Sequence, residues 1–401
     1  MEIKKGYKGY KSYQYLEPGI DYKNFKLAKE IDRVKLYLVP LTAEQEKRFE
    51  EIVKNYVIIS LHEHPSITPE DISELMAYER EGREFTAFEG LAHSCLDAIF
   101  DNLMDGTCVI SSKAGWKWND VLHDIGIRSC DIAHQDFLIK GQSVEDIYRA
   151  KIEGKIAWFI SLESATMIEN ELDRIEILYG LGTRMMGITY SESNNLGSGL
   201  KEKNDGGLTS FGREAVERMN KIGIAIDVSH SGDKTSLDTI KYSKKPIFIT
   251  HAGARSLWNM NRLKPDDVII ACATKGGIIG IEAAPHTTIS KKNPKHDIES
   301  FMEHFEYIKD LVGIDHVAFG PDALYGDHVG LHNMFIKNMS ISENTAGDRF
   351  EHVDYVKGLE NPTEASINII RWLIKHNYSD GDIGKVMGDN IIRVLKEVWV
   401  Y

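Results

Sequence analysis

Short apolar runs alternate with helical patterns along most of this chain, and each run is followed by a polar residue. The segments FGREAVERMNKIG and DIESFMEHFEYIKDLVG illustrate the helical pattern between runs. Parallel strands joined by helices produce such an alternation, and eight units predict an α/β fold closed into a (β/α)8 TIM barrel. The eight runs lie at 56–60, 107–111, 156–162, 184–189, 224–229, 246–250, 277–281 and 316–320.

An open, doubly wound sheet is the alternative fold, since it also alternates strands with helices and places its sites at the carboxyl ends of strands. No GxGxxG fingerprint follows the first apolar run, and histidines follow several of the runs. Both observations favour the barrel, of the kind found in metal-dependent hydrolases.

The chain has 401 residues, a length that one α/β barrel with insertions can account for. We therefore expect a single barrel over residues 51–401. Residues 1–50 are polar and rich in tyrosine, with a charged helical pattern at TAEQEKRFEEIVKN. We interpret them as an N-terminal extension packed on the barrel.

The net charge of −13 argues against nucleic acid or an anionic membrane as the main partner. No apolar stretch approaches the roughly 18–20 residues of a membrane span, and MEIKKGYKGYKSY lacks the apolar core of a signal peptide. The cysteines form no CxxC pair, which is typical of reduced thiols. We expect a cytoplasmic protein with a small-molecule substrate. The four cysteines are Cys95, Cys108, Cys130 and Cys272.

Polar residues at the ends of the apolar runs would meet at one mouth of a barrel, where catalytic groups gather. In SLHEHPS, His62 and His64 share one face of an extended strand, whereas Glu63 points away. The residues just beyond the runs are His62 and His64, Ser112, Glu163, Tyr190, His230, His251, Glu282 and Asp322.

Four histidines and a glutamate in this set suit two divalent ions, most simply zinc, which accepts imidazole nitrogen and carboxylate oxygen. His62 and His64 would bind one ion, His230 and His251 the other, and Glu163 would bridge them. Two ions this close can hold a bridging hydroxide that is nucleophilic at neutral pH. The pattern therefore predicts a metal-dependent hydrolase.

Two further residues suit such a reaction. Asp322 could take a proton from the nucleophile and return it to a leaving amine, although the sequence PDA is also typical of a solvated turn. Arg262, in NRLKPDD, could bind a substrate carboxylate through two hydrogen bonds. From spacing alone, an exposed helix-capping arginine is the better interpretation of Arg262.

Several long phrases in order resemble the renal (membrane) dipeptidase family, peptidase family M19 of the amidohydrolase superfamily. They are LYGLGTRMMGITY, GGLTSFGREAVERMNKIGIAIDVSH, KKPIFITHAGARSL, NRLKPDDVI, GIDHVAFGPD and, more weakly, VMGDNIIRVLKEVW.

The resemblance implies a barrel with a binuclear zinc centre and, since family members often dimerise, a possible homodimer. It implies His62 as the first ligand histidine, Glu163 as the bridging glutamate, and His230 and His251 as ligands of the second ion. It further implies Asp322 as the proton shuttle and Arg262 as the group that binds the substrate carboxylate.

The chain departs from the family pattern at two positions. Members usually carry HxD at the first strand, whereas this chain has His64 in place of the carboxylate, which removes one negative charge from the first ion. Tyr190 stands where the family has a histidine that contacts the substrate. We expect the Tyr190 phenol to contact the substrate and donate to the oxyanion.

The expected reaction is hydrolysis of an amide or peptide bond in a dipeptide-like substrate. Because both departures touch the metal charge and the oxyanion contact, hydrolysis of another small molecule is the alternative: a lactone, a cyclic amide or a specialised amide. A third hypothesis is a barrel that binds a ligand without hydrolysing it.

Overall fold

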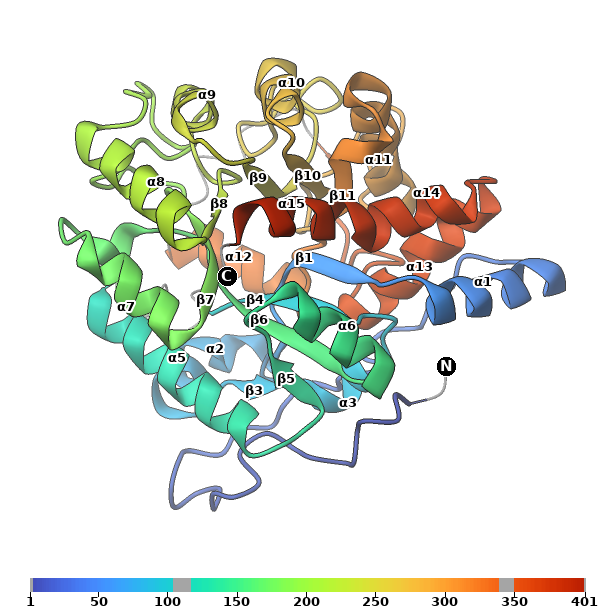
Figure 1. Ribbon diagram of the computed structural model, residues 1–401. Helices are drawn as coiled ribbons and strands as arrows, with labels where there is room; N and C mark the ends of the chain where they lie inside the picture. Colours follow the sequence, from blue (N-terminus) through green and yellow to red (C-terminus); the bar gives the residue numbers. More distant parts are fainter. Residues whose placement is uncertain (1–2, 104–116, 339–349, 400–401) are drawn as a thin grey trace.

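Parallel strands form a ring at the centre of the molecule, with helices around its outside (Figure 1). The structure is a computed structural model and describes residues 3–103, 117–338 and 350–399. The hydrogen-bonded path runs through β1 (Ile59–Glu63), β4 (Ala98–Asn102), β6 (Ile156–Leu162), β7 (Thr183–Gly187), β8 (Ala225–Asp227), β9 (Phe248–Ala252), β10 (Ile278–Ile281) and β11 (Val317–Phe319).

The ends of this path meet, so the sheet closes. Asp322 N donates to His62 O at 3.0 Å, and His64 N donates to Ala323 O at 2.9 Å, which links β1 to the segment just after β11. The predicted (β/α)8 barrel is confirmed. Outside the ring path, β5 (Leu138–Lys140) pairs with β6, and β2 (Ser66–Ile67) pairs antiparallel with β3 (Phe85–Thr86).

Seven of the eight predicted runs overlap strands of the ring, and the run 156–162 coincides with β6. The remaining run, 107–111, lies outside the described residues, and β4 holds the second place in the path. The sequence reading missed β4 because Asp97 and Asp101 border its apolar residues. Both carboxylates are buried with partners: Asp97 accepts from Ile58 N at 3.0 Å, and Asp101 accepts from Trp158 Nε1 at 2.6 Å.

The helices begin and end where local chemistry favours it. At α8, the Thr209 hydroxyl accepts from Gly212 N, and Gly223 ends the helix in the left-handed region with φ 84°. The outer helices are α5 (Trp118–Ala133), α6 (Val144–Glu153), α7 (Asp173–Leu181), α8 (Ser210–Ile222), α9 (Asp233–Tyr242), α10 (Asp266–Thr274) and α11 (Ile298–Val312). The others are α1 (Ala43–Asn55), α2 (Leu75–Glu81), α3 (Phe88–Ala92), α12 (His328–Asn338), α13 (Pro362–Lys375), α14 (Asp380–Gly384) and α15 (Asn390–Val398).

Apolar side chains fill the end of the barrel at which its strands begin. Phe100 and Phe159 stack there at 5.0 Å between ring centroids, and Trp399, just after α15, lies 5.1 Å from Phe159. In Figure 1, α15 crosses the centre of the ring. Because this end is closed by apolar packing, polar chemistry is confined to the opposite end, where the strands finish.

The described part of the N-terminal segment packs on the barrel body. The Asp131 carboxylate, fully buried in α5, accepts from the Tyr10 hydroxyl, the Ser12 hydroxyl and Tyr13 N at 2.7–2.9 Å. Helix α1 confirms the predicted helical segment and runs across residue 50. The division of the chain at that residue stays a prediction.

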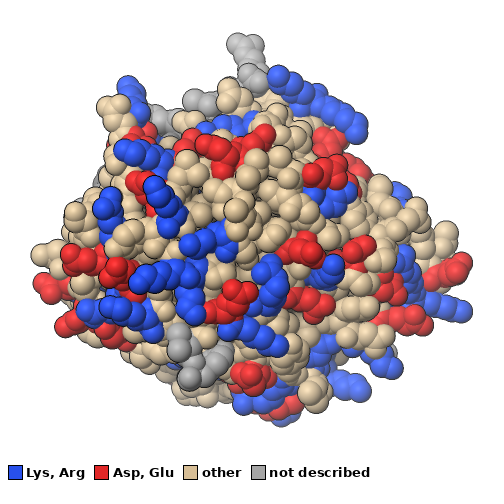
Figure 2. Space-filling view, turned by 45° about the horizontal axis from the view of Figure 1, so that its top comes forward, with Lys and Arg blue, Asp and Glu red and all other residues tan. Residues whose placement is uncertain are grey.

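The surface carries both signs of charge. On the face shown in Figure 2, basic and acidic side chains are interspersed. In the described ranges, no helix is long and apolar enough to cross a membrane. Cys95, Cys130 and Cys272 are free thiols, whereas Cys108 lies outside the described residues.

We predict that Gly187→Ala destabilises the barrel. Gly187 ends β7 against β6, and a Cβ there would overlap the Glu163 carbonyl oxygen. Because backbone cannot move aside as a side chain can, we expect a loss of about 1–3 kcal/mol in the free energy of unfolding, measured by denaturant titration. Gly126→Ala is the control: it lies in α5 with open space around its Cβ, and should gain about 0.5–1 kcal/mol. Equal stability of the two variants would contradict this packing.

Candidate metal centre

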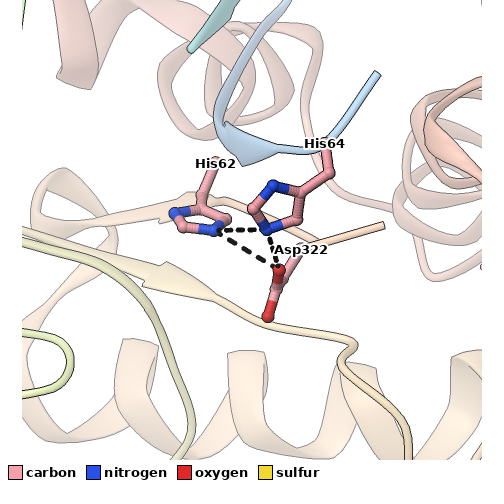
Figure 3. A group of neighbouring side chains, drawn as sticks. All are labelled: His62, His64 and Asp322. Atoms are coloured by element: carbon pink, nitrogen blue, oxygen red, sulfur yellow. Dashed lines mark hydrogen bonds and ion pairs between the residues drawn. The ribbon is translucent and has the colours of Figure 1, made fainter. Parts of the chain in front are cut away.

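Two histidines from β1 and an aspartate from the segment after β11 converge at the mouth of the barrel (Figure 3). His62 Nε2 and His64 Nε2 lie 3.3 Å apart. Asp322 Oδ1 lies 3.3 Å from His62 Nε2 and 3.0 Å from His64 Nε2. All three side chains are buried, so these groups face one another rather than solvent.

A second group shares His62 and centres on Glu163, which follows β6. Glu163 Oε1 lies 3.1 Å from His62 Nε2 and 3.3 Å from His251 Nε2. His230, which follows β8, places its Nε2 3.5 Å from the same oxygen and 3.0 Å from His251 Nε2. Five of the predicted site residues and Asp322 are therefore brought together at one mouth.

Irregular pairing at two strands directs these ligands inward. Ile59 and Leu61 belong to the apolar cluster inside the barrel, so strict alternation would turn Glu63 rather than His62 toward the centre. However, Ser60 pairs with Ile99 while Glu63 pairs with Asp101, a step of three residues in β1 against two in β4. This bulge reverses the alternation and brings His62 to the centre.

A bulge of the same kind occurs at β9, where Ile249 pairs with Ile279 and Ala252 pairs with Ile281. The extra residue falls beside His251. At β1, the displaced Glu63 accepts from Ser60 Oγ at 2.9 Å and from Ala323 N at 2.7 Å. Burial raises the pKa of this carboxyl to about 8.

Contacts to the Nδ1 atom orient the rings of three of the four histidines. The Asn102 side-chain amide contacts His62 Nδ1 at 2.8 Å, and the Asn102 carbonyl contacts His64 Nδ1 at 3.2 Å. Thr250 Oγ1 lies 2.8 Å from His251 Nδ1. His230 instead stacks on the half-buried Tyr190 ring, at 4.2 Å between centroids. Sequence analysis missed Asn102, although it ends the run AIFDN and could have been found as a strand-end residue.

The buried charges shift one another's pKa values. Burial would raise the pKa of the Glu163 carboxyl, but hydrogen bonds from His230, His251 and His62 hold it well below its usual value. Burial would lower the pKa of His62, yet Asp322 and Glu163 raise it to about 9. The two carboxylates thus favour the protonated form of His62.

His230 and His251, in contrast, favour the neutral form. Burial and the nearby Arg262 charge lower the pKa of His230 to about 4. Burial, with the charges of His62 and Arg262, holds the pKa of His251 well below its ordinary value. Neutral imidazoles are the form that binds metal ions.

Arg262 is buried at the mouth and is not the exposed capping residue that spacing alone favoured. Its Nη1 donates to His251 O at 3.1 Å, and its Nη2 lies 2.5 Å from Glu282 Oε2. Glu282 follows β10 and is fully buried, which raises its pKa to about 7 despite the Arg262 charge.

The donors present fit divalent ions of the zinc type, because imidazole nitrogens and carboxylate oxygens are grouped close together. Within each of three groups in the described part of the chain, the potential ligand atoms lie within 4.8 Å of one another. The groups are His62, His64 and Asp322; His62, Glu163 and His251; and His251, Glu282 and Asp322. The division of ligands between two ions stays a prediction.

Comparison with known proteins identifies relatives of this chain. The sequence model of the membrane dipeptidase family (peptidase family M19) matches residues 119–335. That range holds Glu163, His230, His251 and Asp322, whereas the two histidines of β1 lie before it.

Dipeptidase tcpJ of Claviceps purpurea (strain 20.1) is 27% identical over 268 residues, which are 66% of this chain and 56% of that protein. Dipeptidase verJ of Clonostachys rogersoniana is 27% identical over 291 residues, 72% of this chain and 66% of that protein. The matched part is thus less than two thirds of the length of either relative.

Among solved structures, an amidohydrolase from Pseudomonas aeruginosa superposes with a TM-score of 0.70. The two chains are 26% identical, and the superposition covers 88% of this chain and 99% of that one. The barrel therefore follows an architecture already seen in an amidohydrolase.

We predict that Asn102→Leu weakens metal binding. Leucine fills the same space but cannot hold the His62 ring through Nδ1, and losing such a contact costs about 10–100-fold in metal affinity. Competition with a chelator of known affinity measures the change. Asn119→Leu, on the exposed start of α5, is the control and should leave affinity unchanged. An unaltered affinity in the Asn102 variant would show that Asn102 does not orient His62.

Proposed function

Because the chain belongs to the membrane dipeptidase family, peptidase family M19, we propose that it is a metal-dependent hydrolase that cleaves amide bonds in dipeptide-like substrates. The observation that carries this proposal is the convergence of four histidines and two carboxylates at one mouth of a barrel. The names of tcpJ and verJ, both dipeptidases, agree with it.

We assign the metal ligands to His62, His64, Glu163, His230 and His251. Two divalent ions bound there would lower the pKa of a coordinated water and polarise the scissile carbonyl. Glu163 Oε1 lies within 3.5 Å of His62, His230 and His251, so this carboxylate would be the ligand that the two ions share. The proposal takes zinc as the ion, on the strength of this donor set.

Asp322 acts as the proton carrier in this scheme. Burial would raise the pKa of its carboxyl, but His62 and His64 hold it well below the ordinary value, so it is ionised at neutral pH. An ionised carboxylate at the mouth can accept a proton from the attacking water and return it to the leaving nitrogen.

Tyr190 and Arg262 are proposed to contact the substrate. The Tyr190 ring is half-buried and stacks on His230, which places a phenol beside the ligand set. A phenol can donate to the oxygen that becomes negative as the carbonyl is attacked. Arg262 lies on the other side of His251, whose carbonyl it contacts.

A second candidate function keeps the metals but changes the bond, to that of a lactone, a cyclic amide or a specialised amide. The observation in its favour is the ion pair that occupies Arg262. A panel of dipeptides, cyclic amides and lactones, assayed side by side, separates the two candidates.

The wider proposal places the protein in the cytoplasm as a homodimer. The free thiols of Cys95, Cys130 and Cys272 suit a reducing compartment. The dimer rests on resemblance to the family alone.

Removing the metal or its central ligand should abolish activity. We expect chelator-treated protein to be inactive on a dipeptide panel and to recover with zinc. Glu163→Gln should lower metal content and reduce activity by more than the roughly 10–100-fold typical of losing an outer contact. Elemental analysis and kcat/KM provide the measurements. Glu171→Gln, an exposed glutamate, is the control. Activity that is indifferent to both treatments would refute the mechanism.

Asp322→Asn should lower kcat by about 10²–10⁴-fold with little change in KM, because the amide cannot carry the proton. Asp322 has φ 58°, a conformation that asparagine also tolerates, so the fold should be kept. The control is Asp32→Asn, an exposed aspartate with the same φ. Loss of bound metal in the Asp322 variant would assign this residue to the ligands instead.

A further inference from the structure

A buried ion pair beside the ligand set joins Arg262 to Glu282, and Glu282 has no part in the mechanism above. Arg262 Nη2 lies 2.5 Å from Glu282 Oε2, and neither residue is open to solvent, with Glu282 at 0% and Arg262 at 8% exposure. Arg262 also uses Nη1 on the His251 carbonyl, at 3.1 Å. Nη1 is thus engaged in a hydrogen bond, and Nη2 in an ion pair with Glu282.

The pair lies within reach of the reaction centre. A carboxylate oxygen of Glu282, a ring nitrogen of His251 and a carboxylate oxygen of Asp322 all lie within 4.8 Å of one another. A substrate that reaches the metal ligands would thus meet Glu282 and Arg262 together. When Glu282 is ionised, its charge cancels that of Arg262, and the substrate meets a pair without net charge.

A free substrate carboxylate would be disfavoured at this position. To bind Arg262 through two hydrogen bonds, it must displace Glu282 or share one guanidinium with it. Two carboxylates side by side in a buried site repel each other, and one must then be neutralised or moved. An uncharged carbonyl, amide or ester group meets neither obstacle.

We propose that Glu282 sets the substrate specificity of this site, so that the subsite at Arg262 accepts an uncharged group in place of a free carboxylate. The substrate class is then a peptide-like amide whose carboxyl end is blocked, as an amide, an ester or a ring. This inference rests on the proposed hydrolase function and narrows its substrate. Glu282 acts by filling the guanidinium that a carboxylate needs.

The test compares alanyl-alanine with alanyl-alaninamide, which differ only in that end group. The zinc-loaded wild-type protein should have the higher kcat/KM on the amide. Glu282→Gln should shift the ratio of the two kcat/KM values toward alanyl-alanine by about tenfold or more, mainly through KM, because Arg262 becomes available. In the double variant Glu282→Gln with Arg262→Gln, the shift should disappear.

Two controls separate this effect from general damage. Glu360→Gln removes the carboxylate of a second ion pair, the buried Glu360 with the half-buried Arg33, which includes none of the ligands, and should leave the ratio unchanged. Glu282→Asp keeps the charge and should keep the preference for the amide. Calorimetry with the products alanine and alaninamide gives a readout independent of turnover: Glu282→Gln should bind alanine more tightly than the wild type does.

The outcomes are distinct. A wild-type preference for alanyl-alanine, or an unchanged ratio in Glu282→Gln, overturns the inference and leaves the hydrolase intact. Loss of metal from Glu282→Gln also overturns it, because Glu282 would then be a ligand. If the wild type cleaves neither substrate nor any other amide with zinc restored, the proposed function fails, and the calorimetry alone decides whether Glu282 excludes a carboxylate.

Discussion

The interaction on which the rest of the structure depends is the contact of one carboxylate oxygen, Glu163 Oε1, with three imidazoles. A carboxylate buried to this degree is costly to remove from water unless opposing charge and hydrogen bonds surround it. The partners come from β1, β8 and β9, so the charge can be compensated only when the ring of strands is complete. Closure of the sheet and assembly of the site are therefore one event rather than two.

The sequence was sufficient for the barrel and for most of the site because both depend on local patterns. The run at β6 is apolar except for Ser161 and bounded by the charged residues Lys155 and Glu163, so its ends could be predicted to the residue. β4 was missed because Asp97 and Asp101 are typical of a loop in the sequence. Their buried hydrogen-bond partners become known only from the structure. The bulges at β1 and β9 could not be predicted, since they depend on pairing with the next strand.

The ion pair between Arg262 and Glu282 at the mouth could not be predicted from the sequence either. Glu282 and Arg262 could each be named from the sequence, one as a strand-end residue and the other from a family phrase, but their contact is tertiary. The pair also matters for the replacement of the family's carboxylate by His64. A carboxylate expected at the first strand is replaced by an imidazole, while another carboxylate, Glu282, stands two strands away around the ring, where an arginine balances it. The two positions change the distribution of charge around the ligands as well as its amount.

Closure of the barrel also determines the order of events in folding. Ala323 N donates to Glu63 Oε2 across a sequence separation of 260 residues, next to the backbone bonds that join β1 to the end of β11. Forming a contact between such distant segments costs loop entropy that only the finished ring repays. During synthesis, β1 must wait with one edge unpaired until β11 has been made. His62 and His64 can meet Asp322 only after that, so high metal affinity requires the closed barrel.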